Sequence, residues 1–437
     1  MRRLSLFVAL LLLVPTGATL AASVQSSATP CAGTISEPAA GTTVISVQGA
    51  RGREKTPARL VGVGPRGKLK WVHDGPENID VVWGYDVDPL DNGNLFVVGT
   101  FREGGHGKTV FYEFNPRTQE TVWVETVNIT DTHDADLLDD GRIAIANMRN
   151  YDHANETNDD RLVIYNRSTD SFEEEWLFRE HYQPDTGGDY VEDWTHVNDV
   201  DRVNDTHYLL SPRNLDQVVL VDIETGEIDL RLGADNQWKT LKRQHNPQYL
   251  EREDGTPTLL VADSDNNRIV EFEKRDDGWE RTWTVGSGST LEWPRDADRL
   301  PSGNTLVVDS RHNRVIEVTP QGEVVWEVYS PWLVYDAERV RVGDDDEQRG
   351  PTMADVGAGG SYQLQGAPVR SESDQEDCAV AINGVRPGEV RDVSTVTASA
   401  TPTTPTAPTQ TDGAGFGLLA ALVALVSLAA LAGRTRA

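Results

Sequence analysis

Short runs of alternating apolar and polar residues, separated by Gly, Asn and Asp, recur along most of the chain. Such alternation is typical of half-buried β-strands, and no amphipathic helix is predicted between the two terminal segments. One stretch shows the arrangement clearly, because four runs follow one another with short turns between them. We expect these four runs to form one antiparallel sheet: 295–300, 305–309, 314–319 and 323–329.

We call each such set of runs a repeat unit. A short motif coincides with the first run of each unit. It reads polar or aromatic residue, Asp, any residue, acidic residue, any residue, Leu or Val. Periods near forty to fifty residues, filled with short β runs, indicate a β-propeller. Equivalent strands of a closed ring aim the first motif position at a common axis, where we expect the active site. The six first positions are Tyr85, His133, Asn198, His245, Arg295 and Tyr335, and the copy at His245 keeps only the register.

The two ends of the repeat region are predicted to complete each other. The run 335–340 begins a unit without three strands after it, whereas 43–48, 58–63 and 69–73 precede the first full unit. A blade assembled from both ends would pair strand edges that otherwise stay open. The predicted fold is therefore all-β, a six-bladed propeller with one blade closed by strands from both ends. An acidic loop around 180–192 could cover the channel mouth.

The segments outside the repeats predict an exported, membrane-anchored protein. The apolar run after Met1-Arg-Arg3 resembles a signal peptide or anchor, and the apolar run 416–433 is near the lower length limit of a membrane span. Basic residues at both ends place the middle of the chain outside the cell, at the cell surface. The predicted segments are a signal or anchor at 1–22, a linker at 23–42, the propeller at 43–345, an extension at 346–393, a Thr/Pro-rich stalk at 394–411 and a span or sorting signal with a basic tail at 413–437.

The charge narrows the range of partners. A formal net charge of -30, with only seven lysines, disfavours binding to nucleic acid or anionic lipid. The acidic residues are spread evenly along the chain, and this distribution resembles that in the proteins of halophilic archaea. Cys31 and Cys378 flank the repeats and are expected to form a disulfide in an oxidising compartment. Asn-x-Ser/Thr sites fit a glycoprotein: Asn128, Asn155, Asn166 and Asn204.

Three histidines fall at or beside the axial register. His245 is the candidate nucleophile, because a neutral imidazole attacks well when its other nitrogen is held. His133 and His196, the latter two residues before Asn198, suit acid/base work or oxyanion contact. The other six histidines are interpreted as structural or exposed. Three histidines could also be metal ligands, but no His-x-His pair or Cys/His cluster supports this, so we predict neither metal nor cofactor.

Arginines recur near the ends of the second strands, at Arg102, Arg149, Arg213 and Arg311. Arginine forks match sulfate, phosphate or carboxylate oxygens, which indicates an anionic substrate. For Arg102, Arg149 and Arg311, pairing with the acidic residues of the repeats is an equally good interpretation.

Four motifs resemble the arylsulfate sulfotransferase family: Thr132-His133-Asp134, Asp193-Trp194-Thr195-His196-Val197-Asn198, Ser211-Pro212-Arg213 and Gln244-His245. The resemblance implies a six-bladed propeller that moves a sulfuryl group from an aryl sulfate ester to a phenolic acceptor, through a sulfohistidine and without a nucleotide donor. It implies His245 as nucleophile and His133 as a residue that protonates the leaving phenolate. His196, Asn198 and Arg213 would contact the sulfuryl oxygens. Arg295, Tyr85 and Tyr335 are further predicted substrate contacts, and Pro212 could shift Arg213.

A second hypothesis remains open. The runs 261–270 and 307–316 resemble NHL-type repeats, which occur in ligand- or protein-binding modules and in metal-dependent lyases. A fold match alone does not define chemistry. The NHL interpretation accounts for outer strands but not for the set His196, Asn198, Arg213 and His245, so sulfuryl transfer is the preferred prediction.

Overall fold

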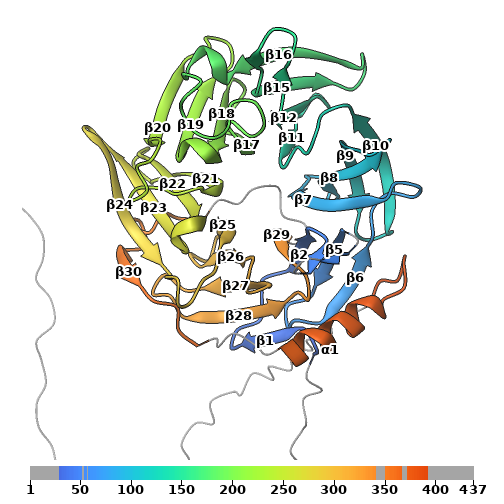
Figure 1. Ribbon diagram of the computed structural model, residues 1–437. Helices are drawn as coiled ribbons and strands as arrows, with labels where there is room; N and C mark the ends of the chain where they lie inside the picture. The colour runs from blue at the N-terminus through green and yellow to red at the C-terminus, as the bar shows by residue number, and fades with distance from the viewer. Residues whose placement is uncertain (1–28, 52–53, 57, 341–349, 367–371, 392–437) are drawn as a thin grey trace, which may run out of the picture. The chain divides into compact units, whose positions relative to one another are not determined.

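The computed structural model describes residues 29–391 except 52–53, 57, 341–349 and 367–371. Its strands form six blades arranged around a central axis (Figure 1). The predicted all-β six-bladed propeller is therefore confirmed. The predicted signal or anchor, stalk and carboxy-terminal span lie outside the described residues. Within the described part, no helix has the length and apolar character needed to cross a membrane.

Five blades are built in chain order, each with its first strand innermost. Blade one contains β7 (Val81–Pro89), β8 (Leu95–Glu103), β9 (His106–Asn115) and β10 (Glu120–Val127). Blade two contains β11 (Ala135–Leu137), β12 (Ile143–Asn147), β15 (Arg161–Asn166) and β16 (Ser171–Leu177). Blade three contains β17 (Val197–Arg202), β18 (His207–Pro212), β19 (Gln217–Asp222) and β20 (Ile228–Gly233). Blade four contains β21 (His245–Glu251), β22 (Pro257–Asp263), β23 (Arg268–Arg275) and β24 (Gly278–Val285). Blade five contains β25 (Pro294–Arg299), β26 (Thr305–Asp309), β27 (Arg314–Val318) and β28 (Val324–Tyr329).

The sixth blade joins the two ends of the repeat region, as the sequence predicts. Its strand order is β29-β2-β5-β6, so the innermost strand comes from the end of the region and the other three from its beginning. The strands are β29 (Val334–Val340), β2 (Thr42–Val47), β5 (Arg59–Val63) and β6 (Leu69–His73). Antiparallel pairing of β29 with β2 closes the ring and satisfies both edges.

Several shorter elements are added to the blades. The outer edges of blades five and four receive β1 (Ala32–Ile35) and the parallel strand β30 (Gly360–Tyr362). Two small hairpins lie between blade strands: β3 (Ala50–Arg51) with β4 (Glu54–Lys55), and β13 (Tyr151–Asp152) with β14 (Thr157–Asn158). The 3-10 turns are η1 (Phe178–Glu180), η2 (Arg213–Leu215) and η3 (Ser264–Asn266).

No amphipathic helix was predicted between the terminal segments; the helix that the described residues contain there, α1 (Glu372–Asn383), is not amphipathic and was not expected. Its apolar residues are consecutive, Ala379 to Ile382, rather than spaced at helical intervals, so the periodicity test does not detect it. Ala379 and Ile382 pack on blades five and six, while Val380 is exposed. The disulfide between Cys31 and Cys378 ties this helix to the turn before β1.

Apolar side chains fill the seams between blades. Six clusters of buried residues each join two neighbouring sheets, because both faces of every blade are covered by a neighbour. The largest fully buried side chains include Trp194, Trp283 and Trp326. This packing holds the innermost strands in a fixed ring.

The repeated Asp explains how those innermost strands adhere to one another. Asp336 accepts the backbone N–H of Val87 in the next blade at 2.9 Å, and Asp296 accepts that of Ala337 at 3.4 Å. At the fourth motif position, Asp136 accepts the N–H of Arg202 at 2.5 Å. Motif side chains thus satisfy backbone donors that face the channel, where no neighbouring strand pairs with them.

Candidate active site

The structure brings together all six side chains at the first motif position, and all of them are buried. The ring of Tyr85 stacks on that of His133 at 4.2 Å, and its centroid is 5.1 Å from that of Tyr335. The rings of Tyr335 and His245 are 6.4 Å apart. In four blades an irregularity in strand pairing falls beside this position, which re-aims the side chains of consecutive residues.

A second set of site residues lies two positions before the axial residue in four consecutive blades. Each has a positive φ, so the chain turns there as it enters the innermost strand; the residues are Asp131, His196, Arg243 and Trp293. Non-glycine residues in this region are uncommon and concentrate at functional sites. Of these four, His196 was a predicted site residue from the sequence, and Trp293 was noted there as an aromatic close to the start of an inner strand. The constant offset of two residues is the signal that identifies the other three.

His245 is held so that one nitrogen is free. Its Nδ1 lies 2.8 Å from the Ser264 hydroxyl oxygen, and that hydroxyl donates to the carbonyl of Ala262 at 3.2 Å. With the Ser264 proton directed to Ala262, Nδ1 of His245 is the donor and Nε2 carries the lone pair. Within the described residues, Nε2 has no hydrogen-bond partner and is not among the fully enclosed atoms.

Burial lowers the pKa of His245 well below its ordinary value, and the charges of Arg213 and Arg295 lower it further. The imidazole is therefore neutral at neutral pH. The ring of Trp293 lies 5.7 Å from it. A neutral imidazole with a free lone pair, surrounded by fixed positive charge, is a nucleophile suited to an anionic substrate.

His196 is held in the same tautomer by a carboxylate. Its Nδ1 lies 2.6 Å from Asp193 Oδ1. Burial lowers the pKa of His196 to about 3, although Asp193 opposes the shift. Burial alone would raise the pKa of Asp193, but the hydrogen bond with His196 and the charges of Arg213 and Arg149 outweigh it and hold that pKa below its usual range. His196 thus donates Nδ1–H to an ionised Asp193 and keeps the lone pair on Nε2.

His133 is placed differently. Its Nε2 lies 3.8 Å from Asp131 Oδ1, while its Nδ1 is enclosed without a partner. Burial is the main cause that lowers its pKa. Asp131 also accepts the Tyr85 hydroxyl proton and pairs with Arg149 at 2.7 Å. Asp131 therefore connects an aromatic, a histidine and an arginine of the site.

The side chains of Asn198 and Arg295 form part of the wall of the site, where hydrogen bonds hold them in place. The Asn198 amide donates to the carbonyl of Gln244 at 3.0 Å, which fixes the backbone that enters His245. The Arg295 guanidinium donates to Ser310, to Gln48 and to the carbonyl of Val334. It lies over the rings of Trp293 and Tyr335, at 4.7 and 4.4 Å. Tyr335 in turn donates its hydroxyl to the carbonyl of Asn198 at 3.2 Å.

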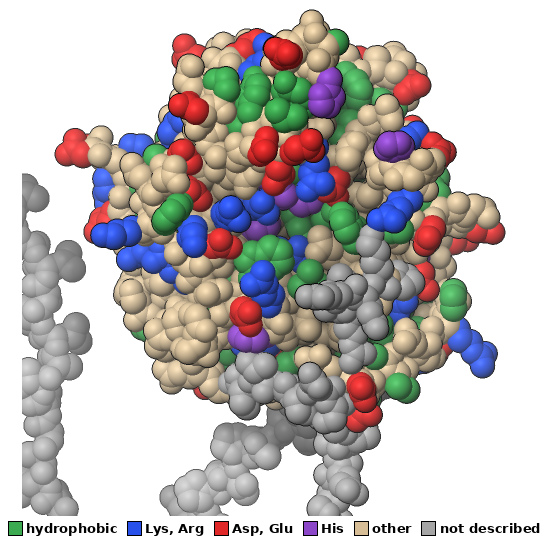
Figure 2. All heavy atoms as spheres, viewed as in Figure 1, with side chains coloured by type: hydrophobic (Ala, Val, Ile, Leu, Met, Phe, Trp, Pro, Cys, Tyr) green, Lys and Arg blue, Asp and Glu red, His purple; other side chains and the backbone are tan. Residues whose placement is uncertain are grey.

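Arg213 is the more accessible cation, with 17% of its side chain exposed. It begins η2 directly after Pro212, and its backbone N–H donates to the carbonyl of His196 at 3.3 Å. Its guanidinium lies 3.6 Å from Asp193. Pro212 therefore does not separate Arg213 from the histidines. The face of the ring shows histidine and basic side chains gathered near its centre (Figure 2).

A cavity of about 500 Å³ adjoins Arg213. Its lining includes the basic residues Lys242 and Arg243, the largely exposed ring of Trp238, and five aspartates: Asp189, Asp193, Asp216, Asp235 and Asp265. Gly187 and Gly188, from the acidic loop predicted to cover the mouth, also line it. The ring of Trp238 is a stacking surface for an aromatic group, and the basic side chains lie beside aspartates rather than alone.

The three histidines of the site, His133, His196 and His245, do not form a metal site. In the described part of the chain, no group of three or more His, Cys, Asp or Glu side chains is placed to hold a metal ion. Two arginines stand near His245 instead, and their charge opposes a cation. The fold and the site together define a propeller with a cationic, histidine-containing axial centre.

Comparison with protein families agrees with this class. The model of the arylsulfotransferase (ASST) family matches residues 53–258. The match contains His133, His196, Asn198, Arg213 and His245. No curated protein matches the chain.

Solved structures resemble the chain only distantly. A protein of unknown function from Bacteroides caccae has a TM-score of 0.43 at 10% identity, covering 68% of this chain and 98% of that chain. A catalytically inactive virginiamycin B lyase from Staphylococcus aureus, with quinupristin, has a TM-score of 0.38 at 10% identity, covering 65% and 84%. Similarities at this level carry no argument about function.

Proposed function

We propose that this protein is an aryl-sulfate sulfotransferase in which Nε2 of His245 carries the sulfuryl group from donor to acceptor. The observation that carries the proposal is the hydrogen-bond chain from His245 through Ser264 to Ala262, which leaves a free lone pair on Nε2. The family match supports arylsulfotransferase chemistry in general. The geometry around His245 supports a histidine-bound intermediate.

In the first half-reaction, Nε2 of His245 attacks the sulfur of the aryl sulfate. The N–S bond forms as the S–O bond to the aryl group breaks, and the phenolate leaves with the electron pair of that bond. The product is a sulfated imidazolium whose Nδ1–H still donates to Ser264. Arg213 and Arg295 stabilise the negative charge on the sulfuryl oxygens, by analogy with phosphoryl transfer.

In the second half-reaction, a phenol acceptor attacks the sulfur and the N–S bond breaks. Nε2 of His196 accepts the phenol proton, because Asp193 fixes its tautomer and stabilises the resulting imidazolium. His245 returns to its neutral form, and the proton passes from His196 to solvent. His133 remains the predicted second acid/base residue, acting through Nε2, since its Nδ1 is enclosed.

We also propose that the protein works outside the cytoplasm. The disulfide between Cys31 and Cys378 supports an oxidising compartment. We likewise propose that the protein is anchored in the membrane and adapted to high salt.

The test uses the purified full-length chain with para-nitrophenyl sulfate and a phenol acceptor in high salt. Without acceptor we expect about one equivalent of nitrophenol per protein, and with acceptor continuous release. His245→Ala should abolish both phases, whereas His106→Ala, on an exposed strand residue, should change neither. Mass spectrometry of the acceptor-free sample should place one SO₃ group on His245.

Two outcomes would contradict the proposal. Nitrophenol release that survives in a folded His245→Ala variant would exclude His245 as the sulfuryl carrier. A wild-type protein that binds the ester without releasing nitrophenol would instead fit the alternative of a binding module. Circular dichroism of both variants distinguishes loss of chemistry from loss of fold.

A further inference from the structure

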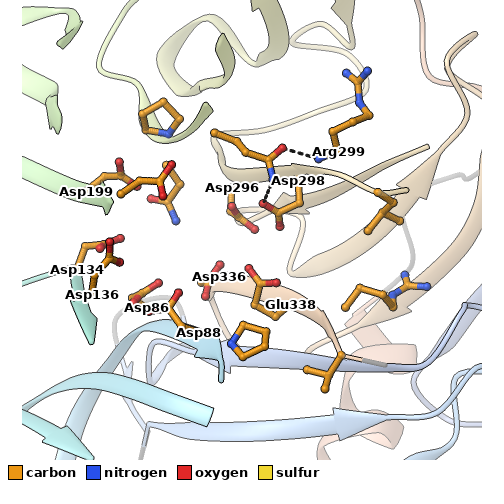
Figure 3. A pocket seen from close by; sticks show the side chains of 18 of the residues that line it. Asp86, Asp88, Asp134, Asp136, Asp199, Asp296, Asp298, Arg299, Asp336 and Glu338 are labelled. Carbon is orange, nitrogen blue, oxygen red and sulfur yellow. Dashed lines mark hydrogen bonds between the residues drawn. The ribbon is translucent and has the colours of Figure 1, made fainter. Parts of the chain in front are cut away.

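A second cavity, of about 200 Å³, is lined by the second and fourth positions of the same motif. Its lining contains carboxylates from five of the six innermost strands, and many of them face one another across the space between strands (Figure 3). They are Asp86, Asp88, Asp134, Asp136, Asp199, Asp201, Asp296, Asp298, Asp336 and Glu338.

Some of these carboxylate oxygens already accept hydrogen bonds that join neighbouring blades. Asp336, Asp296 and Asp136 accept backbone N–H groups of the next blade, as described above. These bonds explain why the motif carries Asp. The cluster of acidic residues would therefore by itself indicate no more than an inter-blade seam.

Three buried oxygens are left without any partner. They are Oδ2 of Asp86, Oδ2 of Asp199 and Oδ1 of Asn246, in residues that are 7%, 5% and 8% exposed. Asn246 is informative because it is neutral and belongs to the one motif copy that has lost its acidic residues. A buried polar atom without a partner is costly, and all three residues line this cavity.

The basic residues of the lining have other counter-charges. Arg299 lies 3.0 Å from Glu271, and Arg339 lies 3.0 Å from Glu317. Neither glutamate is among the lining residues. Carboxylates that face one another in a buried space repel when they are ionised, and a bound cation removes that repulsion.

We propose that this cavity binds a hard divalent cation of the Ca²⁺ type. The oxygens on offer are carboxylate and amide oxygens, which Ca²⁺ prefers, with flexible geometry and with water completing its shell. In the described residues the carboxylates form no ready-made cage. The cavity volume has room for several waters, so the ion is held partly through its own hydration water.

The experiment is calorimetric titration of the full-length chain, dialysed against a chelator, with Ca²⁺ and separately with Mg²⁺ at constant high KCl. We expect one saturable site per molecule for at least one of the two ions, and a higher thermal unfolding midpoint when it is filled. The double substitution Asp86→Asn and Asp199→Asn keeps the side-chain shape and removes two charges. It should weaken binding by about 100-fold.

The matched control is Asp139→Asn with Asp205→Asn, two side chains that are 86% and 93% exposed. This variant removes the same charge from the surface and should bind like the wild type. If the buried double variant does not fold, Asn246→Leu against Asn246→Asp replaces it, with only the Asp variant expected to bind. A folded wild type without saturable binding of either ion, or a buried variant that binds as tightly as wild type, would overturn the proposal.

Discussion

Two histidines of the site expose the same nitrogen because a neighbouring oxygen holds the other one. His245 is oriented by a hydroxyl and His196 by a carboxylate, and this difference separates their roles. A carboxylate partner stabilises an imidazolium, which suits a proton acceptor. A hydroxyl partner leaves the ring less basic, which suits a group that must release the sulfuryl it has accepted.

The role of His196 can be tested through its partner. Asp193→Asn removes the charge that supports proton uptake, so transfer to the acceptor should slow by on the order of 100-fold, the usual contribution of a general base. The single equivalent of nitrophenol released without acceptor should remain. Rapid-quench measurement of both phases checks this prediction. Equal loss of the two phases would show that Asp193 supports the whole site rather than His196.

The lowered histidine pKa values predict an unusual acid limb of the pH profile. Neutral imidazole is the active form of both residues, and the pKa of His196 is about 3 while that of His245 lies well below 6.5. Activity should therefore persist as the pH falls from about 8 to about 5, where ordinary histidines would become protonated. The pH dependence of kcat/KM at constant salt measures this. A fall centred near the ordinary histidine value would contradict it.

At this scale the sequence predicted the axial residues but not their partners. The motif register placed Tyr85 and His245 on innermost strands and His133 two residues before one, because the repeat encodes strand geometry directly. Ser264 and Asp193 come from turns whose paths depend on tertiary packing, so no periodic pattern marks them. For the same reason the burial of Arg295 in the wall could not be read from its position.

At the scale of elements, the innermost strand explains the whole motif. The position two residues earlier turns the chain, the first position faces the site, and the Asp positions join neighbouring blades. Strands such as β6 and β26 were predicted to the residue, since alternation and turn residues define them. Strands β1 and β30 and helix α1 were missed, because they add to outer surfaces where pairing with distant residues decides the structure.

The disulfide is the element-scale feature with the clearest stability effect. It links α1 to the start of β1 across 347 residues of sequence, outside the closure of the ring itself. Replacing both cysteines, Cys31→Ser and Cys378→Ser, should lower the free energy of unfolding by about 2–4 kcal/mol. Denaturant unfolding of the variant and of reduced wild type checks this. The single equivalent of nitrophenol should be unaffected at low temperature, because the site lies on other strands.

At the scale of the whole molecule, the high net negative charge governs the expected dependence of stability on salt. A net charge of -30 repels itself, and salt screens this repulsion over about 10 Å at 0.1 M and about 3 Å at 1 M. We expect the thermal unfolding midpoint to rise steadily with KCl. Sucrose at matched osmolality is the control, because it stabilises without screening. A midpoint that responds equally to both would show that charge repulsion does not limit stability.

The strand β29 has a consequence for biosynthesis. It supplies Tyr335 to the site and the last pairing edge to the ring, yet the strands that wait for it, β2, β5 and β6, are made first. A chain released early from the ribosome therefore has an open ring and an incomplete site at once. A chain that ends before β29 leaves the edge of β2 unpaired, so this last innermost strand couples closure of the ring to completion of the site.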